Sequence, residues 1–457
     1  MENKRETLSS RLGFILLSAG CAIGLGNVWR FPFITGKNGG AGFVLIYLIF
    51  LVLLGLPVMA MEFAIGRGSK QNIALSLKTL ERKGSKWHLY GPLAVIGNYV
   101  LLMFYTTIAG WIFYYFISAA KGEFNNITAE GVNTFFSALV ANPTKQITWM
   151  VAVVVISMSV VAIGLKNGVE KITKYIMLAL LFIMLLLTIH SLTLPGTAEG
   201  LKFYLIPNFK SMKEIGFSTI LYEALGQAFF TLSIGIGAMS IFGSYIDDER
   251  SLGGESARII ALDTFVAITA GLIIFPACFS YGVSVGQGPS LLFITLPNIF
   301  SKMTGGRIWA SLFFLFMSFA ALSTIIAVCE NIISYWIDVK HYSRTKACVI
   351  NAILLIVLSL PCILGFNVLS SIQPFGEGSN ILDLEDFIVS NLLLPFGSLL
   401  FILFCTRSSG WGFENALKEI NKGKGLKISN LLRFYLSYII PIIVLFIMIK
   451  GIWDKLF

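Results

Sequence analysis

The sequence predicts an all-α integral membrane protein with about eleven transmembrane helices. Hydrophobic residues make up 56% of its 457 residues and charged residues only 13%, and its mean hydropathy is +0.81. Soluble globular chains carry about 25% charged residues, so this composition excludes a soluble domain. Repeated apolar runs of about 20 residues or more are long enough to cross the hydrocarbon core of a bilayer as helices.

The predicted spans follow one another with short connections. In chain order they cover residues 11–37, 41–66, 89–120, 147–164, 168–192, 216–245, 258–284, 307–338, 345–365, 380–405 and 431–453. The longest connections are 67–88, 121–146 and 192–215, which leave no room for a catalytic domain outside the membrane. We therefore expect one transmembrane domain over residues 1–457, with the lipid bilayer as a partner.

Basic residues predict the orientation. Most of the 34 Lys and Arg residues fall in loops on the same side as the N-terminus, and the densest group lies within residues 67–86. The positive-inside rule places that side in the cytoplasm, and an odd number of spans places the C-terminus outside, in a multi-pass protein of the cytoplasmic membrane. Because this loop bias also explains the net charge of +10, we expect no nucleic-acid partner.

The residue types that carry enzyme chemistry are sparse. The six cysteines lie within or at the ends of predicted spans and form no CxxC pair, so we expect free thiols. The three histidines are scattered, and the chain contains no HExxH, GxSxG or phosphate-binding loop. An enzyme is therefore not expected.

Two predicted spans are interrupted by glycine in a similar way. The first reads GLG at residues 24–26, and the sixth reads GIG at residues 235–237. Glycine disfavours helix and lets backbone groups turn toward a cavity. Because the interrupted spans are five apart, residues 11–192 and 216–405 are expected to form two inverted repeats with a binding site at the breaks. The alternative is that these glycines only allow close helix packing.

Four stretches carry a family resemblance. They read SRLGFILLSAGCAIGLGNVWRFPFITGKNGGAGF (10–43), MEFAIGRG (61–68), GQAFFTLSIGIGAMSIFGSYI (226–246) and FITLPNIF (293–300). These stretches closely resemble the neurotransmitter:sodium symporter family, especially its bacterial amino-acid transporters. The resemblance implies a 5+5 inverted repeat with broken spans one and six. It also implies uptake by alternating access coupled to Na⁺, with two sodium ions in each cycle.

The same resemblance implies two sodium sites made of oxygen ligands, as a hard cation requires. The first would consist of Ala22, Asn27, Thr231 and Asp263 together with a carboxylate oxygen of the substrate. The second would consist of the carbonyls of Gly20, Ile23 and Ala320 and the hydroxyls of Ser323 and Thr324. Taken alone, these two hydroxyls would more often donate to preceding carbonyls of their own helix.

Asp263 is the most informative single position. A carboxylate within a span costs about 2.5–3.5 kcal/mol on insertion scales unless it is paired or functional. Many members of the family carry asparagine at this position, and chloride-dependent members use a serine where this chain has Ala267. The charge of Asp263, with Tyr47, Gln227 and Thr231 around it, predicts transport without chloride. The alternatives are that this carboxylate is merely paired within the bundle and that Asp263 couples transport to protons.

The resemblance also implies an amino-acid substrate. Monoamine carriers of the family place aspartate at the position of Gly24, whereas glycine leaves room for a substrate carboxylate at the N-terminal end of a half-helix. Tyr105 would donate to that carboxylate and would form an outer lid with Phe230. The implied substrate-binding residues are Ala22, Gly24, Gly26, Leu101, Tyr105, Phe230, Thr231, Ser233, Ile236, Thr324 and Val328. Because the side-chain pocket among them is apolar, we expect hydrophobic or neutral L-amino acids.

Charged residues on either side of that site predict two gates. Outside, Arg30 would pair with Asp386. Inside, Arg5 would pair with Asp338, and Tyr245 would support the contact. The alternatives are that Arg30 reaches the membrane interface with its long side chain and that Arg5 only reflects the positive-inside bias.

Two other classes of protein stay open. A receptor that binds an amino acid without moving it would need a signalling domain, and the short tails provide none. A sodium channel would lack alternating gates. The sequence does not indicate an oligomeric state.

Overall fold

The computed structural model describes residues 6–283 and 291–456, which form almost only helices. Within these ranges, nine helices are long and apolar enough to cross a membrane, and the bent pair of α1 (Arg11–Ala22) and α2 (Phe31–Lys37) makes a tenth span. At the predicted sixth span lie α12 (Phe217–Thr231) and α13 (Ala238–Tyr245), separated by a break. The predicted all-α fold with about eleven spans is confirmed.

Spans one to five make up the predicted first repeat, and spans six to ten the predicted second. The first contains α1, η1 (Gly26–Arg30) and α2; α3 (Ala41–Phe50), η2 (Leu51–Gly55) and α4 (Leu56–Ser69); α6 (Tyr90–Lys121); α8 (Pro143–Ala162); and η4 (Leu165–Glu170) with α9 (Lys171–Ser191). The second contains α12 and α13; α14 (Leu252–Ser280); α16 (Gly306–Lys340); α17 (Arg344–Leu364); and α18 (Ile381–Phe387), η6 (Ile388–Leu393) and α19 (Leu394–Thr406). The eleventh span consists of η8 (Tyr435–Ile439) and α21 (Ile440–Leu456).

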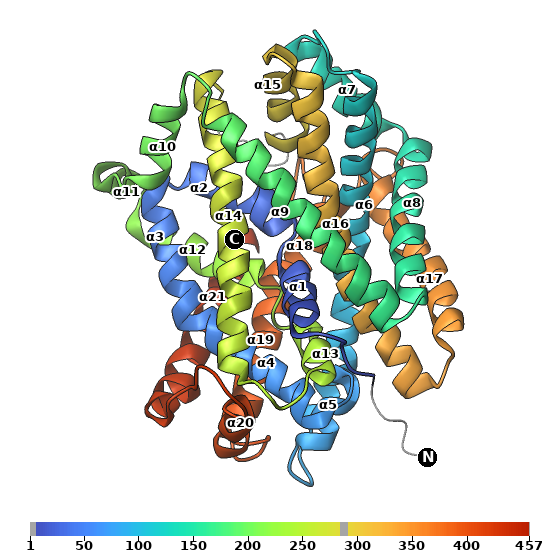
Figure 1. Cartoon of the computed structure of the whole chain (residues 1–457), viewed down its shortest axis with the longest axis vertical. Coiled ribbons are helices and arrows are strands. Elements are labelled where there is room, and N and C mark those ends of the chain that lie inside the picture. Colours follow the sequence, from blue (N-terminus) through green and yellow to red (C-terminus); the bar gives the residue numbers. More distant parts are fainter. Residues whose placement is uncertain (1–5, 284–290, 457) are drawn as a thin grey trace.

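The connections between spans hold short helices. Those on one side are α7 (Ala129–Ala141), α10 (Thr197–Leu205), α11 (Phe209–Ile215) and η5 (Leu291–Thr295) with α15 (Leu296–Lys302). Those on the other side are α5 (Ile73–Leu80), η3 (Trp87–Leu89), α20 (Phe413–Ile420) and η7 (Asn430–Leu432). Figure 1 shows α7, α10, α11 and α15 at one end of the molecule and α5 and α20 at the opposite end.

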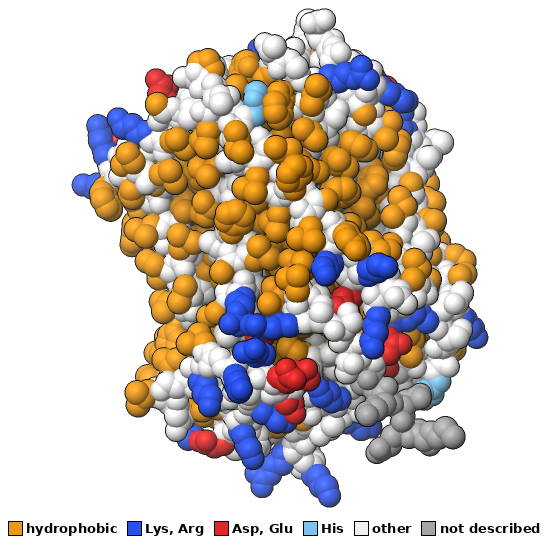
Figure 2. Space-filling view, viewed as in Figure 1, with side chains coloured by type: hydrophobic (Ala, Val, Ile, Leu, Met, Phe, Trp, Pro, Cys, Tyr) orange, Lys and Arg blue, Asp and Glu red, His pale blue; other side chains and the backbone are white. Residues whose placement is uncertain are grey.

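A belt of exposed apolar side chains crosses the face of the bundle that Figure 2 shows. On α9, the exposed residues Leu178, Phe182, Leu185 and Ile189 recur every three or four positions and so share one helix face. Such a face is stable against lipid tails but not against water. In the same view, basic side chains gather mainly below the belt, at the end where α5 and α20 lie. The chain is a multi-pass membrane protein.

Helix α16 lies in the middle of the bundle and is almost wholly buried. It packs against α6, α9 and α1. The second half of span six, α13, packs against α4. The breaks in spans one and six therefore lie inside the protein, where non-helical backbone is tolerated because neighbouring side chains satisfy its polar groups.

Candidate functional site

The first span is broken at residues 23–25, and its two halves meet at an angle of 55°. The amide groups released by the break find side-chain acceptors. Gly24 N–H donates to Asn27 Oδ1 at 3.2 Å, and Leu25 N–H donates to the hydroxyl of Tyr105 on α6 at 3.0 Å. Backbone amides in mid-membrane thus point toward polar side chains rather than toward helical carbonyls.

Space at the break explains why residue 24 is glycine. A Cβ atom on Gly24 would lie 2.4 Å from the Tyr105 hydroxyl and 2.7 Å from Thr324 Oγ1. Both distances are far below van der Waals contact, so even alanine would displace these side chains. The present arrangement leaves no room for an aspartate side chain at this position.

The sixth span is broken at residues 232–237, and a buried carboxylate holds the break. Glu62 of α4 accepts the N–H of Gly235 at 2.8 Å and the N–H of Met239 at 3.0 Å. The Tyr90 hydroxyl donates to the carbonyl of Gly235 at 2.7 Å. The backbone groups that the break releases are therefore satisfied by side chains from the first repeat.

Three side chains from three different spans meet beside the breaks, and we call them the first oxygen cluster: Asn27, Thr231 and Asp263. Asn27 Nδ2 donates to Asp263 Oδ1 at 2.8 Å and to Thr231 Oγ1 at 2.9 Å. Thr231 Oγ1 donates to Asp263 Oδ2 at 3.2 Å. Asp263 is fully buried, and among the described residues no cation forms an ion pair with it. Asp263 is thus paired within the bundle by hydrogen bonds from neutral side chains and not by a described cation.

Two of the side chains predicted around Asp263, Thr231 and Tyr47, face it. The hydroxyl of Tyr47 faces Thr231 and Asp263. Gln227 lies beside the break in span one, because its Nε2 donates to the carbonyl of Gly26 at 3.0 Å. All of these side chains are buried. The Asp263 carboxylate thus lies among neutral hydroxyl and amide groups.

A second group of oxygens joins α1 to α16, and we call it the second oxygen cluster: the carbonyls of Gly20, Ile23 and Ala320 and the hydroxyls of Ser323 and Thr324. Thr324 Oγ1 lies 3.3 Å from Gly20 O, 3.4 Å from Ile23 O and 3.3 Å from Ala320 O. A hydroxyl has one hydrogen, so it cannot bond to all three carbonyls at once. Ser323 Oγ donates to Ala320 O at 3.0 Å, so the alternative of a hydroxyl bonded to a preceding carbonyl of its own helix also occurs. Both clusters consist of oxygen ligands and fit a hard cation such as Na⁺.

A cavity opens between the broken helices, α6 and α16. It is lined by Ala22, Gly24, Gly26, Leu101, Tyr105, Phe230, Ser233, Thr324 and Leu394. Eight of these nine residues belong to the predicted substrate-binding set. The polar part of the lining comes from the break in span one and from Tyr105, whereas Leu101, Phe230 and Leu394 supply apolar surface.

The cavity differs from the predicted set at four positions. Thr231, Ile236 and Val328 are buried but do not line it. Thr231 lies in the first oxygen cluster instead. Leu394, at the start of α19, was not predicted, because it belongs to no sequence motif and reaches the cavity only through the packing of span ten.

The predicted outer pair is not formed in this structure. The guanidinium of Arg30 lies over the ring of Phe230, 4.1 Å from its centroid. Asp386 accepts a hydrogen bond from Ser390 Oγ at 2.8 Å. Arg30 is thus held by the face of an aromatic ring that lines the cavity, a favourable cation–π contact.

At the predicted inner gate, Tyr245 belongs to a network whose other members the sequence did not predict. Tyr245 donates to Glu330 Oε1 at 2.8 Å, and Arg344 Nη1 bonds to Glu330 Oε2 at 2.7 Å. Asp338 accepts a hydrogen bond from Asn72 Nδ2 at 2.8 Å. Arg5, the predicted partner of Asp338, lies outside the described residues.

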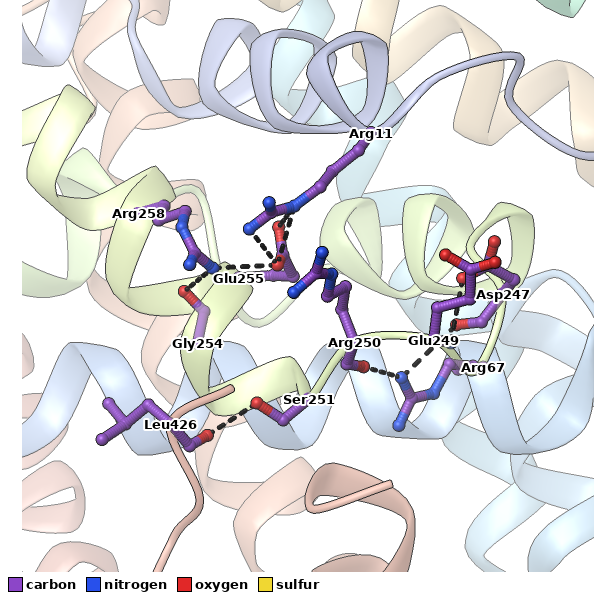
Figure 3. Close-up of polar contacts among 10 residues, drawn as sticks. All are labelled: Arg11, Arg67, Asp247, Glu249, Arg250, Ser251, Gly254, Glu255, Arg258 and Leu426. Carbon is purple, nitrogen blue, oxygen red and sulfur yellow. Dashed lines mark hydrogen bonds and ion pairs between the residues drawn. The ribbon is translucent and has the colours of Figure 1, made fainter. Parts of the chain in front are cut away.

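The start of α1 is held by two buried carboxylates from other spans. Glu170 of η4 accepts Ser9 N–H at 2.7 Å and bonds to the side chains of Ser9 and Ser10. Glu255 of α14 bonds to Arg11 Nη2 and to Arg258 Nη1, each at 2.9 Å. Figure 3 shows Arg11 reaching from α1 to Glu255, with Arg258 on the other side of the carboxylate.

The loops at this end of the bundle are also tied together. Arg67 Nε bonds to Glu419 Oε1 at 2.6 Å. Arg67 Nη1 donates to the carbonyl of Arg250 at 2.7 Å, as Figure 3 shows. Lys422 pairs with Asp248. Partial burial acts to raise the pKa of Asp248, but the hydrogen bond and charge of Lys422 outweigh it and hold that pKa below its usual range.

Comparison with known proteins agrees with this geometry. The sequence profile of the Sodium:neurotransmitter symporter family matches residues 5–135 and 139–455. An uncharacterized sodium-dependent transporter of Bacillus subtilis (strain 168) is 34% identical over 455 residues, covering 99% of each chain. The sodium-dependent serotonin transporter of Drosophila melanogaster is 25% identical over 507 residues, covering 99% of this chain and 77% of that one.

A solved structure shares the fold. The crystal structure of MhsT in complex with L-phenylalanine superposes with a TM-score of 0.87 and 37% sequence identity, covering 98% of this chain and 100% of that chain. The family consists of transporters rather than enzymes. The chain therefore belongs to the sodium:neurotransmitter symporter family, in its bacterial branch.

Proposed function

We propose that this sodium-dependent transporter is a symporter for hydrophobic or neutral L-amino acids and that it does not require chloride. The observation that carries the proposal is the first oxygen cluster, in which the fixed charge of Asp263 lies beside the broken helices. An apolar cavity adjoins the same breaks. The pairing of a charged oxygen cluster with an apolar cavity suits a sodium ion bound next to a zwitterion.

The cavity suits an amino acid with an apolar side chain. Its polar end offers the amide region around Gly24 and the Tyr105 hydroxyl, which would bind the carboxylate at the positive end of a half-helix. Carbonyls of Ala22, Phe230, Thr231 and Ser233 would accept from the ammonium group. The apolar end would hold an aliphatic or aromatic side chain. The bound L-phenylalanine of MhsT, at 37% identity, supports this substrate class.

Two sodium ions would couple binding to closure. One ion would occupy the first oxygen cluster with Ala22 and the substrate carboxylate. The other would occupy the second oxygen cluster and so hold α1 against α16, and its loss would free α1 to move. Two ions crossing about 100 mV and a roughly tenfold gradient would release about 7 kcal/mol, enough to concentrate a zwitterion about 10⁵-fold.

Asp263 would replace the charge that chloride provides elsewhere in the family. Sodium next to a buried carboxylate is neutralised without a mobile anion, since two opposite charges in contact cost less inside a protein than one. Ala267 supplies no hydroxyl that would help to hold chloride. With the N-terminus in the cytoplasm, the cycle would move sodium and amino acid into the cell across the cytoplasmic membrane.

Uptake into proteoliposomes tests this function. We expect labelled L-phenylalanine or L-leucine to accumulate when an inward sodium gradient is imposed, and to accumulate equally when chloride is replaced by gluconate. Labelled substrate should also exchange in counterflow, which a receptor cannot do. Accumulation driven by an acid exterior without sodium would instead favour proton coupling, and flux that does not saturate with amino acid would favour a channel.

A further inference from the structure

Glu385 differs from the other buried carboxylates of the chain. The acidic side chains buried in the described residues are Glu62, Glu170, Glu255, Asp263, Glu330 and Glu385. Each of the first five accepts hydrogen bonds from backbone amides, hydroxyls, an amide side chain or arginine. Glu385 is only 4% exposed, and neither of its carboxylate oxygens accepts a hydrogen bond from an N–H or O–H group of the described residues. It forms no ion pair with any described residue.

No positive charge faces Glu385 from the part of the chain that the structure describes. Glu385 lies on α18, which packs against α6, α17 and η6. The titratable group that faces it from these elements is the thiol of Cys362 on α17, with Thr107 of α6 on the other side of that thiol. On its own helix, the carboxylates of Asp383 and Asp386 bond to the N–H of Asn380 and to Ser390. They add negative charge rather than compensating it.

An ionised carboxylate is unfavourable in such a place. Burial removes the water around the carboxylate, no cation of the described ranges replaces it, and the thiol of Cys362 is only a weak donor. A neutral carboxylic acid loses far less free energy on burial than the ionised form. We propose that Glu385 is a proton-binding site of the transport cycle. It takes up one proton from water when α18 packs against α6 and α17, and it gives the proton back to water when this packing opens.

The position of α18 links this proton to the substrate cavity. Through η6, α18 continues to Leu394, which lines the cavity, while α6 carries Leu101 and Tyr105 of the same lining. Closing the cavity brings these two elements together and buries Glu385 between them. The inference goes beyond the proposed function and rests on it only for the ligand that drives closure.

Proton uptake on binding provides a direct test. Purified full-length protein in weakly buffered solution receives saturating Na⁺ and labelled L-phenylalanine, and binding and pH change are recorded in the same sample with an indicator dye. We expect the wild type to take up one proton more per bound substrate than Glu385→Gln. Glutamine has the shape of the neutral acid, so this variant should fold and still bind. Glu377→Gln, which removes an exposed acid just before α18, is the matched control and should behave like the wild type.

The pH dependence of affinity gives the same answer independently. Since a proton binds together with the substrate, the affinity for L-phenylalanine should fall as pH rises, by up to about tenfold per pH unit. In Glu385→Gln, this decrease in affinity with rising pH should disappear, and the affinity should stay high. Substrate binding with equal proton uptake in the wild type and in Glu385→Gln would overturn the inference.

Two different results separate an error in the proposed substrate from an error in the assignment of Glu385. If the wild type does not bind L-phenylalanine, the proposed substrate is wrong. Infrared spectra of the sodium-loaded protein still test Glu385 in that case. The carbonyl stretch of a neutral carboxylic acid should be present in the wild type and weaker in Glu385→Gln, and an unchanged band would contradict the inference.

Discussion

Asn27 Nδ2 lies 2.8 Å from a carboxylate oxygen of Asp263, and this contact joins broken span one to span seven. The oxygen of the same side-chain amide, Asn27 Oδ1, accepts a hydrogen bond from the N–H of Gly24 at the break. One side chain therefore connects the backbone at the break with the fixed charge of the first oxygen cluster. A cation bound at Asp263 and a substrate bound at the break would each affect the position of Asn27.

The first prediction concerns the charge of Asp263. Asp263→Asn keeps the shape but removes the negative charge, and a hydrogen bond to a charged group contributes about 1.5–3 kcal/mol. We expect the sodium affinity to fall at least about tenfold, measured as the Na⁺ concentration that gives half-maximal L-phenylalanine binding. The double variant Asp263→Asn with Ala267→Ser should regain part of the binding only in chloride. Unchanged sodium affinity in Asp263→Asn would contradict the assigned role.

The second prediction concerns the space at Gly24. Gly24→Ala places a Cβ atom against the Tyr105 hydroxyl. Overpacking of this kind costs about 1–3 kcal/mol, so substrate affinity should fall roughly tenfold to a hundredfold. Gly226→Ala is the matched control, because a Cβ on Gly226 meets no atom within 4 Å. Equal affinities of the two variants in a binding titration would argue against a substrate site at this break.

The third prediction concerns the hydroxyl of Thr324. Thr324→Val keeps the side-chain volume but removes the oxygen that three carbonyls surround. We expect the sodium affinity to decrease by about tenfold, since the remaining ligands lose a hydroxyl partner. Thr269→Val is the control, because Thr269 bonds only to Phe265 O within α14. The second oxygen cluster is not a sodium site if both variants bind sodium like the wild type.

The fourth prediction separates two arginines that share one carboxylate. Arg11 and Arg258 each lie 2.9 Å from Glu255 Oε1, but Arg11 belongs to α1 and Arg258 to the same helix as Glu255. Arg11→Gln should therefore lower the free energy needed to open α1 locally. The decrease should be at most about 1 kcal/mol, or roughly fivefold in the opening equilibrium, because the arginine is partly exposed. Arg258→Gln should not loosen it.

Hydrogen–deuterium exchange measures this difference. Amides of α1 should exchange faster in Arg11→Gln than in the wild type, because local opening of that helix becomes easier. Exchange in α14 should stay the same. Faster exchange of α1 in Arg258→Gln to the same degree would show that Glu255 acts on α1 only through general stability.

Much of the fold could be predicted because membrane burial leaves a strong signal in the sequence. All eleven predicted spans correspond to helices, and both glycine interruptions are real breaks. Short helices such as α7 and α10 were not predicted. Their formation depends on capping and on packing across the ends of the bundle rather than on a long apolar run.

The candidate site could be predicted only in part, for a similar reason. Asn27 and Thr231 belong to stretches with a family pattern, and Asp263 stands out as a carboxylate within an apolar span. The structure brings the three side chains together. Leu394 and the pair of Glu330 and Arg344 have no local pattern and meet their partners only through tertiary packing. Arg30 was predicted to pair with Asp386, but the ring of Phe230 lies closer and takes its place.

Sodium-dependent binding in a chloride-free medium tests the central claim most directly. Equilibrium binding of labelled L-phenylalanine to the purified protein would be measured with sodium gluconate and with potassium gluconate. The proposed function predicts saturable binding that appears with sodium, is unaffected by added chloride, and requires much more sodium in Asp263→Asn. Binding that is independent of sodium, or that appears only when chloride is added, would contradict it.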